Sequence, residues 1–160
     1  MYLKKFLQPD RIKPVIESIR KKGKKISFTN GCFDILHPGH LDLLYHCRNL
    51  ADVLMIALNT DESIRALKGD KRPVFSLEQR VLMLAGYSFV DYIVSFSEES
   101  PLGIIQIIRP DFLVKGADWG HGRIIGEDFV RNYGGKVIAY PIIGDYSTSG
   151  IIDSIISRYS

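Results

Sequence analysis

Apolar positions along this 160-residue chain switch repeatedly between helical spacing and short continuous runs. In residues 10–22 apolar side chains recur every three or four positions, and this period predicts an amphipathic helix. A short strand is predicted at residues 24–29. A second helix is predicted from Pro38, a residue well suited to a first helical turn, to about Asn49. Its inner face is expected to carry Leu41, Leu44 and Tyr45.

The rest of the chain repeats this alternation. Residues 52–58 are almost entirely apolar, which is typical of a strand buried on both faces of a parallel sheet. Ser76-Leu77-Glu78-Gln79 matches a capping box that opens a helix ending at Gly86. Further strands are predicted at residues 91–96, 111–115 and 136–140, and further helices at 61–67, 101–109, 126–133 and from Ser147 onward. Strands alternating with helices predict an α/β fold with a five-stranded parallel sheet.

Composition limits the classes of partner. Apolar residues make up 46% and charged residues 24%, with a net charge of +3, which is too mild to indicate a nucleic-acid partner. The basic cluster at residues 20–25 is interpreted as a solvated helix end rather than a polyanion site. Cys32 and Cys47 have neither disulfide nor zinc spacing, and free thiols fit a reducing cytoplasm. We expect a cytoplasmic protein with no membrane partner, because no apolar stretch is long enough for a signal peptide or a span.

The chain is divided into an N-terminal helical arm, residues 1–23, and a domain over residues 24–160. Four apolar residues near the N-terminus have two interpretations that the sequence does not separate: Tyr2, Leu3, Phe6 and Leu7. They either pack on their own domain or form a docking surface, so a homodimer is one expectation.

Polar residues gather where predicted strands end, at residues 29–40, 59–61 and 115–118. In parallel sheets ligands bind outside these carboxyl ends, near the point where strand order reverses. His37 and His40 flank a Pro-Gly at a strand-to-helix junction, where free N–H groups and the helix dipole favour a phosphate. Histidines here can also be caps, or can share a metal. No thiolate or carboxylate set completes a metal site, so phosphate chemistry is favoured and no protein metal ligand is expected.

Three further segments carry candidate chemistry, each with an ordinary alternative. Residues 68–72 could close over phosphates or be a solvated loop, and Arg80 could hold a phosphate or pair with Glu78 or Asp61. In residues 114–119 a glycine after the strand allows close approach of a flat ring, and Asp118 could accept a hydrogen bond from a base or ribose. Residues 146–150 offer hydroxyls at a helix start, for which an ordinary cap is the favoured interpretation of the segment alone.

His37-Pro38-Gly39-His40 matches the H-x-G-H signature, and the chain resembles the nucleotidyltransferase superfamily that carries it. A longer run, residues 28–40, resembles the adenylyltransferase domain of bacterial ADP-heptose synthases. Companion matches at residues 59–63, 68–69, 72–74, 77–80, 114–116 and 147–148 extend the resemblance over residues 10–158. It implies a Rossmann-like three-layer sandwich of the nucleotidyltransferase type. It also implies transfer of AMP from ATP to D-glycero-β-D-manno-heptose 1-phosphate, giving ADP-heptose and pyrophosphate for the lipopolysaccharide inner core.

The resemblance also implies roles for individual residues. Catalytic roles fall to His37, His40 and Lys68. The implied nucleotide-binding residues are Thr29, Asn30, Gly31, Cys32, Phe33, Gly39, His40, Lys115, Gly116, Asp118, Ser147, Thr148 and Ser149. Those implied for the acceptor phosphate are Asp34, Asn59, Asp61, Arg72 and Arg80. Mg²⁺ is expected to arrive with ATP as the cofactor.

Two departures keep alternatives open. Members of that family carry this domain behind a sugar kinase, which is absent here, so a separate sugar kinase is expected upstream. Residues 117–119 also resemble glycerol-3-phosphate cytidylyltransferase, and residues 146–152 resemble tails of the wider superfamily. The alternatives are therefore a cytidylyltransferase acting on glycerol 3-phosphate or another alcohol or sugar phosphate, and a non-catalytic nucleotide-binding module.

Overall fold

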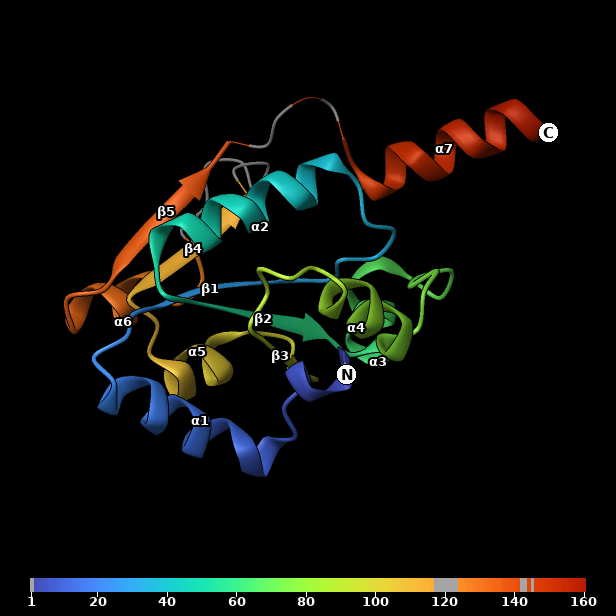
Figure 1. Cartoon of the computed structure of the whole chain (residues 1–160). Helices are drawn as coiled ribbons and strands as arrows, with labels where there is room; N and C mark the ends of the chain where they lie inside the picture. The colour runs from blue at the N-terminus through green and yellow to red at the C-terminus, as the bar shows by residue number, and fades with distance from the viewer. Residues whose placement is uncertain (1, 117–123, 142–143, 145) are drawn as a thin grey trace.

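A five-stranded parallel sheet forms the centre of the computed structural model, which describes residues 2–116, 124–141, 144 and 146–160 (Figure 1). The strands lie in the order β3-β2-β1-β4-β5, and every neighbouring pair is parallel. Their bounds are β1 Ile26–Gly31, β2 Val53–Asn59, β3 Tyr92–Phe96, β4 Phe112–Gly116 and β5 Lys136–Tyr140. The predicted α/β fold with five parallel strands is confirmed.

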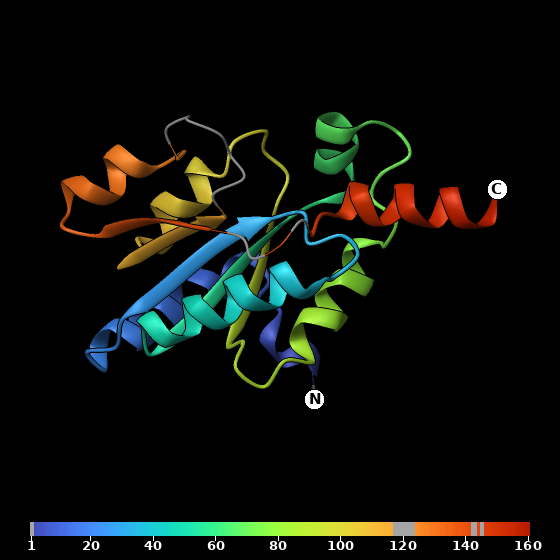
Figure 2. The same cartoon turned by 90° about the horizontal axis from the view of Figure 1, so that it is seen from above.

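Helices connect the strands and cover both faces of the sheet (Figures 1 and 2). They are η1 Tyr2–Lys5, α1 Pro9–Lys21, α2 Pro38–Leu50, α3 Asp61–Lys68, α4 Leu77–Ala85, α5 Leu102–Ile108, α6 Glu127–Asn132 and α7 Thr148–Tyr159. One apolar cluster joins α1, α5 and α6 to one face of the sheet, and a second joins α2 and α4 to the other. The result is the three-layer sandwich implied by the resemblance. None of the described helices reaches the length and apolarity that a membrane-spanning helix needs.

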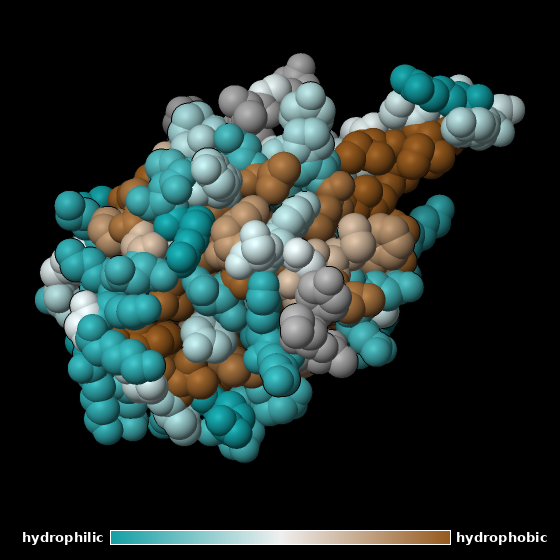
Figure 3. All heavy atoms as spheres, in the orientation of Figure 1, coloured by the Kyte–Doolittle hydropathy of each residue, from teal (hydrophilic) through white to brown (hydrophobic). Residues whose placement is uncertain are grey.

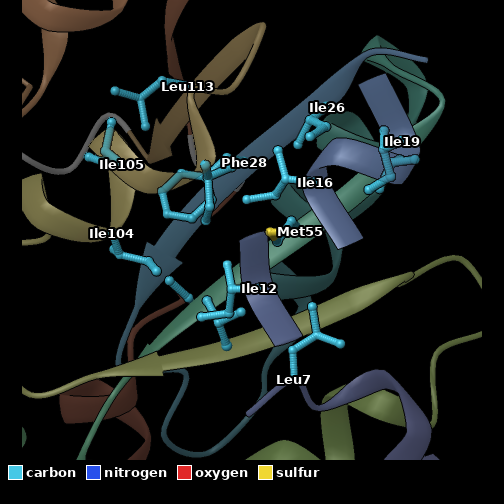
Figure 4. Close-up of a cluster of buried hydrophobic side chains, with 14 of the residues drawn as sticks. Leu7, Ile12, Ile16, Ile19, Ile26, Phe28, Met55, Ile104, Ile105 and Leu113 are labelled. Carbon is cyan, nitrogen blue, oxygen red and sulfur yellow. The ribbon is translucent and has the colours of Figure 1, made fainter. Parts of the chain in front are cut away.

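Both core clusters follow from the spacing of apolar residues. Figure 4 shows Ile12 and Ile16 of α1 lying over Phe28 and Met55 of the sheet, and all four are buried. Each of the seven residues of β2 is buried, because helices cover that strand on both sides. The continuous apolar run therefore marks a central strand, as predicted.

The predicted inner face of α2 is wrong for two of its three residues. Leu44 is fully buried, but Leu41 and Tyr45 are 42% and 57% exposed. Leu43 and Cys47 take their places against the sheet. Apolar residues occur on two sides of this helix, so their spacing alone does not fix its rotation about its own axis.

The N-terminal segment packs against its own domain where the structure describes its side chains. The backbone N–H of Leu7 donates to the carbonyl of Ile93 at 2.8 Å, and Phe6 makes a parallel bridge to the same strand residue. Leu7 belongs to the first core cluster, and Phe6 packs on the second. These contacts support the packed interpretation for both residues.

Helix α7 differs from the other helices because it projects away from the sheet (Figure 1). None of its twelve residues is buried. Ile155 and Ile156 are each about half exposed, and an apolar surface runs along the projecting helix in Figure 3. The beginning of α7 is tied to the site described below by a hydrogen bond of Thr148.

The strand ends opposite the candidate site are fastened by two carboxylates. Asp91 accepts from the backbone N–H of Leu54 at 2.8 Å and from Arg48 at 2.9 Å. Asp111 accepts from the N–H of Ile26 at 2.7 Å. Each carboxylate thus satisfies a backbone donor at the start of a strand.

The capping box of α4 is present, and it generates a stability prediction. The Ser76 hydroxyl accepts from the N–H of Gln79 at 3.4 Å, and the Gln79 side chain accepts from the N–H of Ser76 at 3.0 Å. Replacing Ser76 by alanine removes the first bond, so Ser76→Ala should lower the free energy of unfolding by about 1 kcal/mol. Urea denaturation measures this change.

The control is Ser88→Ala, because Ser88 is exposed and the described residues offer its side chain no hydrogen bond. Its unfolding free energy should stay within about 0.5 kcal/mol of the parent value. Equal stabilities for the two variants would show that the Ser76 cap contributes nothing.

Candidate functional site

The candidate site lies at the carboxyl ends of β1 and β4, where the strand order of the sheet reverses. The β1–α2 loop, residues 32–37, crosses this edge and leads into α2. The α3–α4 loop, residues 69–76, and the beginning of α7 approach it from elsewhere in the chain. Segments that lie far apart in the sequence therefore meet around one short loop.

His37 and His40 form the centre of the site. His37 is the N-cap of α2, and its Nδ1 accepts from the backbone N–H of His40 at 3.3 Å. The two imidazole rings stack with centroids 3.7 Å apart. With Nδ1 as an acceptor, His37 carries its proton on Nε2 as a donor. The first turn of α2 adds the positive end of the helix dipole.

His40 is held in its neutral form. Its Nδ1 is buried and has no hydrogen-bond partner among the described residues. Burial, reinforced by the electrostatic interaction with His37 and opposed by Asp34, lowers the pKa of His40 to about 3. An anionic ligand beside this ring would offset the desolvation and raise that pKa. Binding of a phosphate beside the ring would therefore favour the protonated form of His40.

The β1–α2 loop has an uncommon backbone. Phe33 and Ile35 have positive φ angles of 48° and 51°, and this conformation is a true outlier for a β-branched residue such as Ile35. Phe33 is buried, and its ring lies 5.1 Å from that of His40. A Cβ on Gly31 would come within 3.3 Å of the Phe33 ring. The close fit explains why a glycine precedes this turn.

Asp34, between the two left-handed residues, has a fully buried carboxylate. Its Oδ2 accepts from Arg72 Nε at 2.7 Å and from the N–H of Val74 at 2.8 Å, and its Oδ1 accepts from the N–H of Phe75 at 2.9 Å. Burial alone would raise its pKa, but these three donors prevail and lower the pKa of Asp34. Asp34 therefore stays ionised and joins the β1–α2 loop to the α3–α4 loop.

Arg80 is only 1% exposed, and its guanidinium serves internal partners. It donates to the Cys32 carbonyl at 2.7 Å, to the Phe75 carbonyl at 3.1 Å and to Asp61 Oδ1 at 2.7 Å. The sequence suggested that Arg80 holds a phosphate or pairs with Glu78 or Asp61, and the structure shows the pair with Asp61. The same arginine supports the start of the β1–α2 loop.

Positive charge gathers around Cys32. Burial raises the pKa of this thiol, and the charges of Lys68, Arg80 and Arg72 act against that rise. Lys68 is exposed at the end of α3, whereas Arg72 is half-buried against Asp34. Lys68, Arg72 and the buried Arg80 thus place three positive charges near Cys32.

On the other side of β1, Lys115 Nζ donates to the carbonyl of Asn30 at 2.8 Å and to its Oδ1 at 3.1 Å. Thr29 is fully buried, and its hydroxyl has no partner among the described residues. Gly116 ends β4 beside them and is buried. These residues form a floor between the two strand ends.

The beginning of α7 reaches the same loop. Ser147 caps the helix by accepting from the N–H of Gly150 at 3.0 Å, so the ordinary capping role is present. The Thr148 hydroxyl donates to the Asp34 carbonyl at 2.6 Å, while Ser149 is exposed. The Tyr146 ring lies 6.5 Å from that of His37.

The remaining predicted residues divide into two groups. Asn59 is buried one strand away, where it donates to Ser63 Oγ at 3.0 Å within the start of α3. Asp118 lies outside the described residues. Sequence reasoning did not single out the N–H groups of Val74 and Phe75, because backbone donors leave no signal in side-chain identity.

Metal ligands are sparse in this site. Among the described ranges, no three His, Cys, Asp or Glu side chains gather as a protein metal site requires. Asp34, the nearest buried carboxylate, already accepts three hydrogen bonds.

A cytidylyltransferase-like family model matches residues 28–151 of the chain. The chain is 45% identical over 150 residues to "Bifunctional protein HldE" of Syntrophotalea carbinolica, covering 94% of this chain and 31% of that protein. It is 48% identical over 134 residues to the protein of the same name from Helicobacter hepaticus, covering 84% and 27%. The chain thus spans about a third of the length of the curated relatives it matches.

Two solved structures share the fold. A lipopolysaccharide core biosynthesis protein from Thermoplasma volcanium superposes with a TM-score of 0.62 at 24% identity, over 78% of this chain and all of that one. A pantoate-beta-alanine ligase from Francisella tularensis gives 0.63 at 17% identity, over 91% and 69%. At these identities the likeness concerns the fold alone.

The lowered pKa of His40 generates a prediction about acid stability. The unfolded chain binds this proton below its ordinary pKa of 6.5, whereas the folded chain binds it only near 3. Stability should therefore fall as the pH drops through that window. In urea denaturation, the unmodified protein should lose more unfolding free energy between pH 7 and about pH 4.5 than His40→Gln does. Equal losses would show that His40 titrates normally.

Proposed function

Since this chain belongs to the cytidylyltransferase-like family, we propose that it is a nucleotidyltransferase that transfers AMP from ATP to a sugar 1-phosphate. The proposed acceptor is D-glycero-β-D-manno-heptose 1-phosphate, and the products are ADP-heptose and pyrophosphate. The observation that carries the proposal is the stacked His37–His40 pair at the N-terminus of α2. The identity of 41% or more to relatives named HldE supports the choice of substrate.

The proposed reaction is an in-line displacement at the α-phosphorus of ATP. An oxygen of the acceptor phosphate forms the new P–O bond, and the bond to pyrophosphate breaks. No covalent bond to the protein is required, so catalysis consists of positioning and charge stabilisation. His37 offers its Nε2–H, and the beginning of α2 offers the positive end of its helix dipole, to the oxygens on which charge accumulates.

The other site residues are assigned by where they lie. Thr29, Asn30 and Lys115 form the floor on which the nucleotide is proposed to rest. Lys68 and Arg72, on the opposite side, are proposed to receive the acceptor phosphate. Mg²⁺ bound to the triphosphate would neutralise charge there and is proposed to enter with ATP.

The acceptor needs a source. The curated relatives are named bifunctional and are about three times as long as this chain, which supports a second activity in series with this one. We propose that a sugar kinase supplies the 1-phosphate. The reaction is assigned to the cytoplasm, because ATP is available there and both cysteines are free thiols.

The description of the family model favours one alternative, a cytidylyltransferase acting on glycerol 3-phosphate or a related alcohol phosphate. Pyrophosphate release with Mg²⁺ separates the two when ATP and CTP are each combined with heptose 1-phosphate and glycerol 3-phosphate. Turnover with ATP and heptose 1-phosphate alone is expected. Turnover with CTP and glycerol 3-phosphate would replace the substrate assignment. Nucleotide binding without turnover would indicate a non-catalytic module.

His40→Ala tests the catalytic role of the pair. If the ring stabilises charge in the transition state, kcat should fall on the order of 10²-fold or more while the ATP dissociation constant changes little. Steady-state kinetics and equilibrium binding measure the two quantities. His46→Ala, six residues farther along α2 where the ring stacks on Tyr140, is the matched control and should keep kcat. An unchanged kcat in His40→Ala would contradict the assignment.

A further inference from the structure

The β1–α2 loop adopts a backbone that its own sequence does not favour. Positive φ angles at Phe33 and Ile35 are unfavourable for residues with a Cβ, and most of all for the branched Ile35. Such a conformation persists only when surrounding contacts over-determine it. The loop ends at His37, so whatever holds the loop also places the first histidine of the pair.

Asp34 supplies the contacts on one side. Its buried carboxylate takes three donors from the α3–α4 loop, at 2.7–2.9 Å: Arg72 Nε and the N–H groups of Val74 and Phe75. These donors lie about forty positions farther along the chain. A buried carboxylate requires such donors, because its charge has been removed from water. The three hydrogen bonds therefore hold the α3–α4 loop in a fixed position against the β1–α2 loop.

Thr148 supplies the contact on the other side. Its hydroxyl donates to the backbone carbonyl of Asp34 at 2.6 Å and comes from 114 positions away. The rest of α7 has no buried residue, and the helix projects away from the sheet just after this point (Figure 2). Among the described residues, this is the polar side-chain contact that joins α7 to the loop.

We propose that Asp34 and Thr148 are positioning residues, and that Thr148 acts on the reaction through the backbone of Asp34. The proposal rests on the proposed nucleotidyltransferase function. The contacts hold the left-handed turn, the turn holds the N-cap at His37, and the N-cap aligns both imidazoles. A displacement of about 1 Å at reacting groups is enough to cost about 10²-fold in rate. The links should therefore affect kcat more than nucleotide affinity.

Arg72 fits the same scheme. Its Nε is taken by Asp34, and the described residues provide no partner for its two terminal nitrogens. The bond to the carboxylate therefore fixes the direction in which the outer edge of the guanidinium faces. Asp34 in this way orients both the histidine pair and a cation of the opposite loop.

Thr148 gives the decisive test, because an isosteric and a conservative variant are both available. Thr148→Val removes the hydroxyl and keeps the shape, so kcat should fall by about 10-fold or more while the ATP dissociation constant stays within about 3-fold. Thr148→Ser keeps the hydroxyl and should restore kcat to within about 3-fold of the parent. A raised ATP dissociation constant with unchanged kcat would overturn the proposal, because it would make Thr148 a nucleotide ligand. Failure of serine to rescue would also overturn it.

Asp34→Asn supplies a second test with a matched control. Asp91 accepts, like Asp34, from one arginine and from backbone, but at the opposite end of the sheet. Both asparagine variants should lower the melting temperature, and only Asp34→Asn should lower kcat. Equal kcat values in the two variants would overturn the role of Asp34. If Asp34→Asn fails to fold, the Thr148 variants still decide.

Hydrogen exchange separates this proposal from the assignment of the reaction. In ligand-free protein, amides of residues 33–40 should exchange faster in Thr148→Val than in the parent or in Thr148→Ser. Asp91→Asn should leave them unchanged. If the parent protein shows no turnover with any nucleotide and acceptor, the proposed function is wrong, but the expected difference in hydrogen exchange is unaffected. Unchanged exchange in Thr148→Val would remove the positioning role even if the parent is active.

Discussion

A charge enclosed within the protein organises the whole candidate site. The Asp34 carboxylate has no exposed surface, so it requires donors that remain in place. An arginine side chain and two backbone N–H groups supply them, and the loop that carries these donors is drawn against the loop that carries the histidines. Removing any donor would leave the charge under-satisfied. The β1–α2 and α3–α4 loops are not adjacent in the chain. Their relative position is therefore set by the need to neutralise one buried anion.

The site combines groups with opposite electrostatic tasks. Arg80 is buried, and its guanidinium donates hydrogen bonds to two carbonyls and to Asp61, whereas Lys68 is exposed at the surface. His40 is kept neutral by burial, while Asp34 is kept ionised by its donors. Burial disfavours charge in both of the latter, and only Asp34 has partners that reverse the effect. The fold thus sets two ionisable groups, six residues apart in sequence, in opposite states.

Sequence patterns predicted those parts of the fold that rest on local rules. The apolar run of β2 and the capping box at Ser76 are read from neighbouring residues, and both are present. The rotation of α2 was mispredicted, because Leu41 and Leu43 are equally apolar and only the sheet distinguishes them. In the site, residue types indicated which segments meet. They did not indicate that Arg80 would face Cys32 and Phe75, or that Thr148 would face a backbone carbonyl, since such pairings arise only in three dimensions.

The bond between Thr148 and Asp34 has a consequence for the order in which the molecule takes shape. All five strands precede residue 148, and the histidine loop lies within the first quarter of the chain. Protein synthesis proceeds from the N-terminus, and closing a contact across so long a separation is slow. A chain can therefore pair its strands while the loop beside them still lacks its last support. A helix that follows all five strands in the sequence thus completes a site whose histidines follow the first of them.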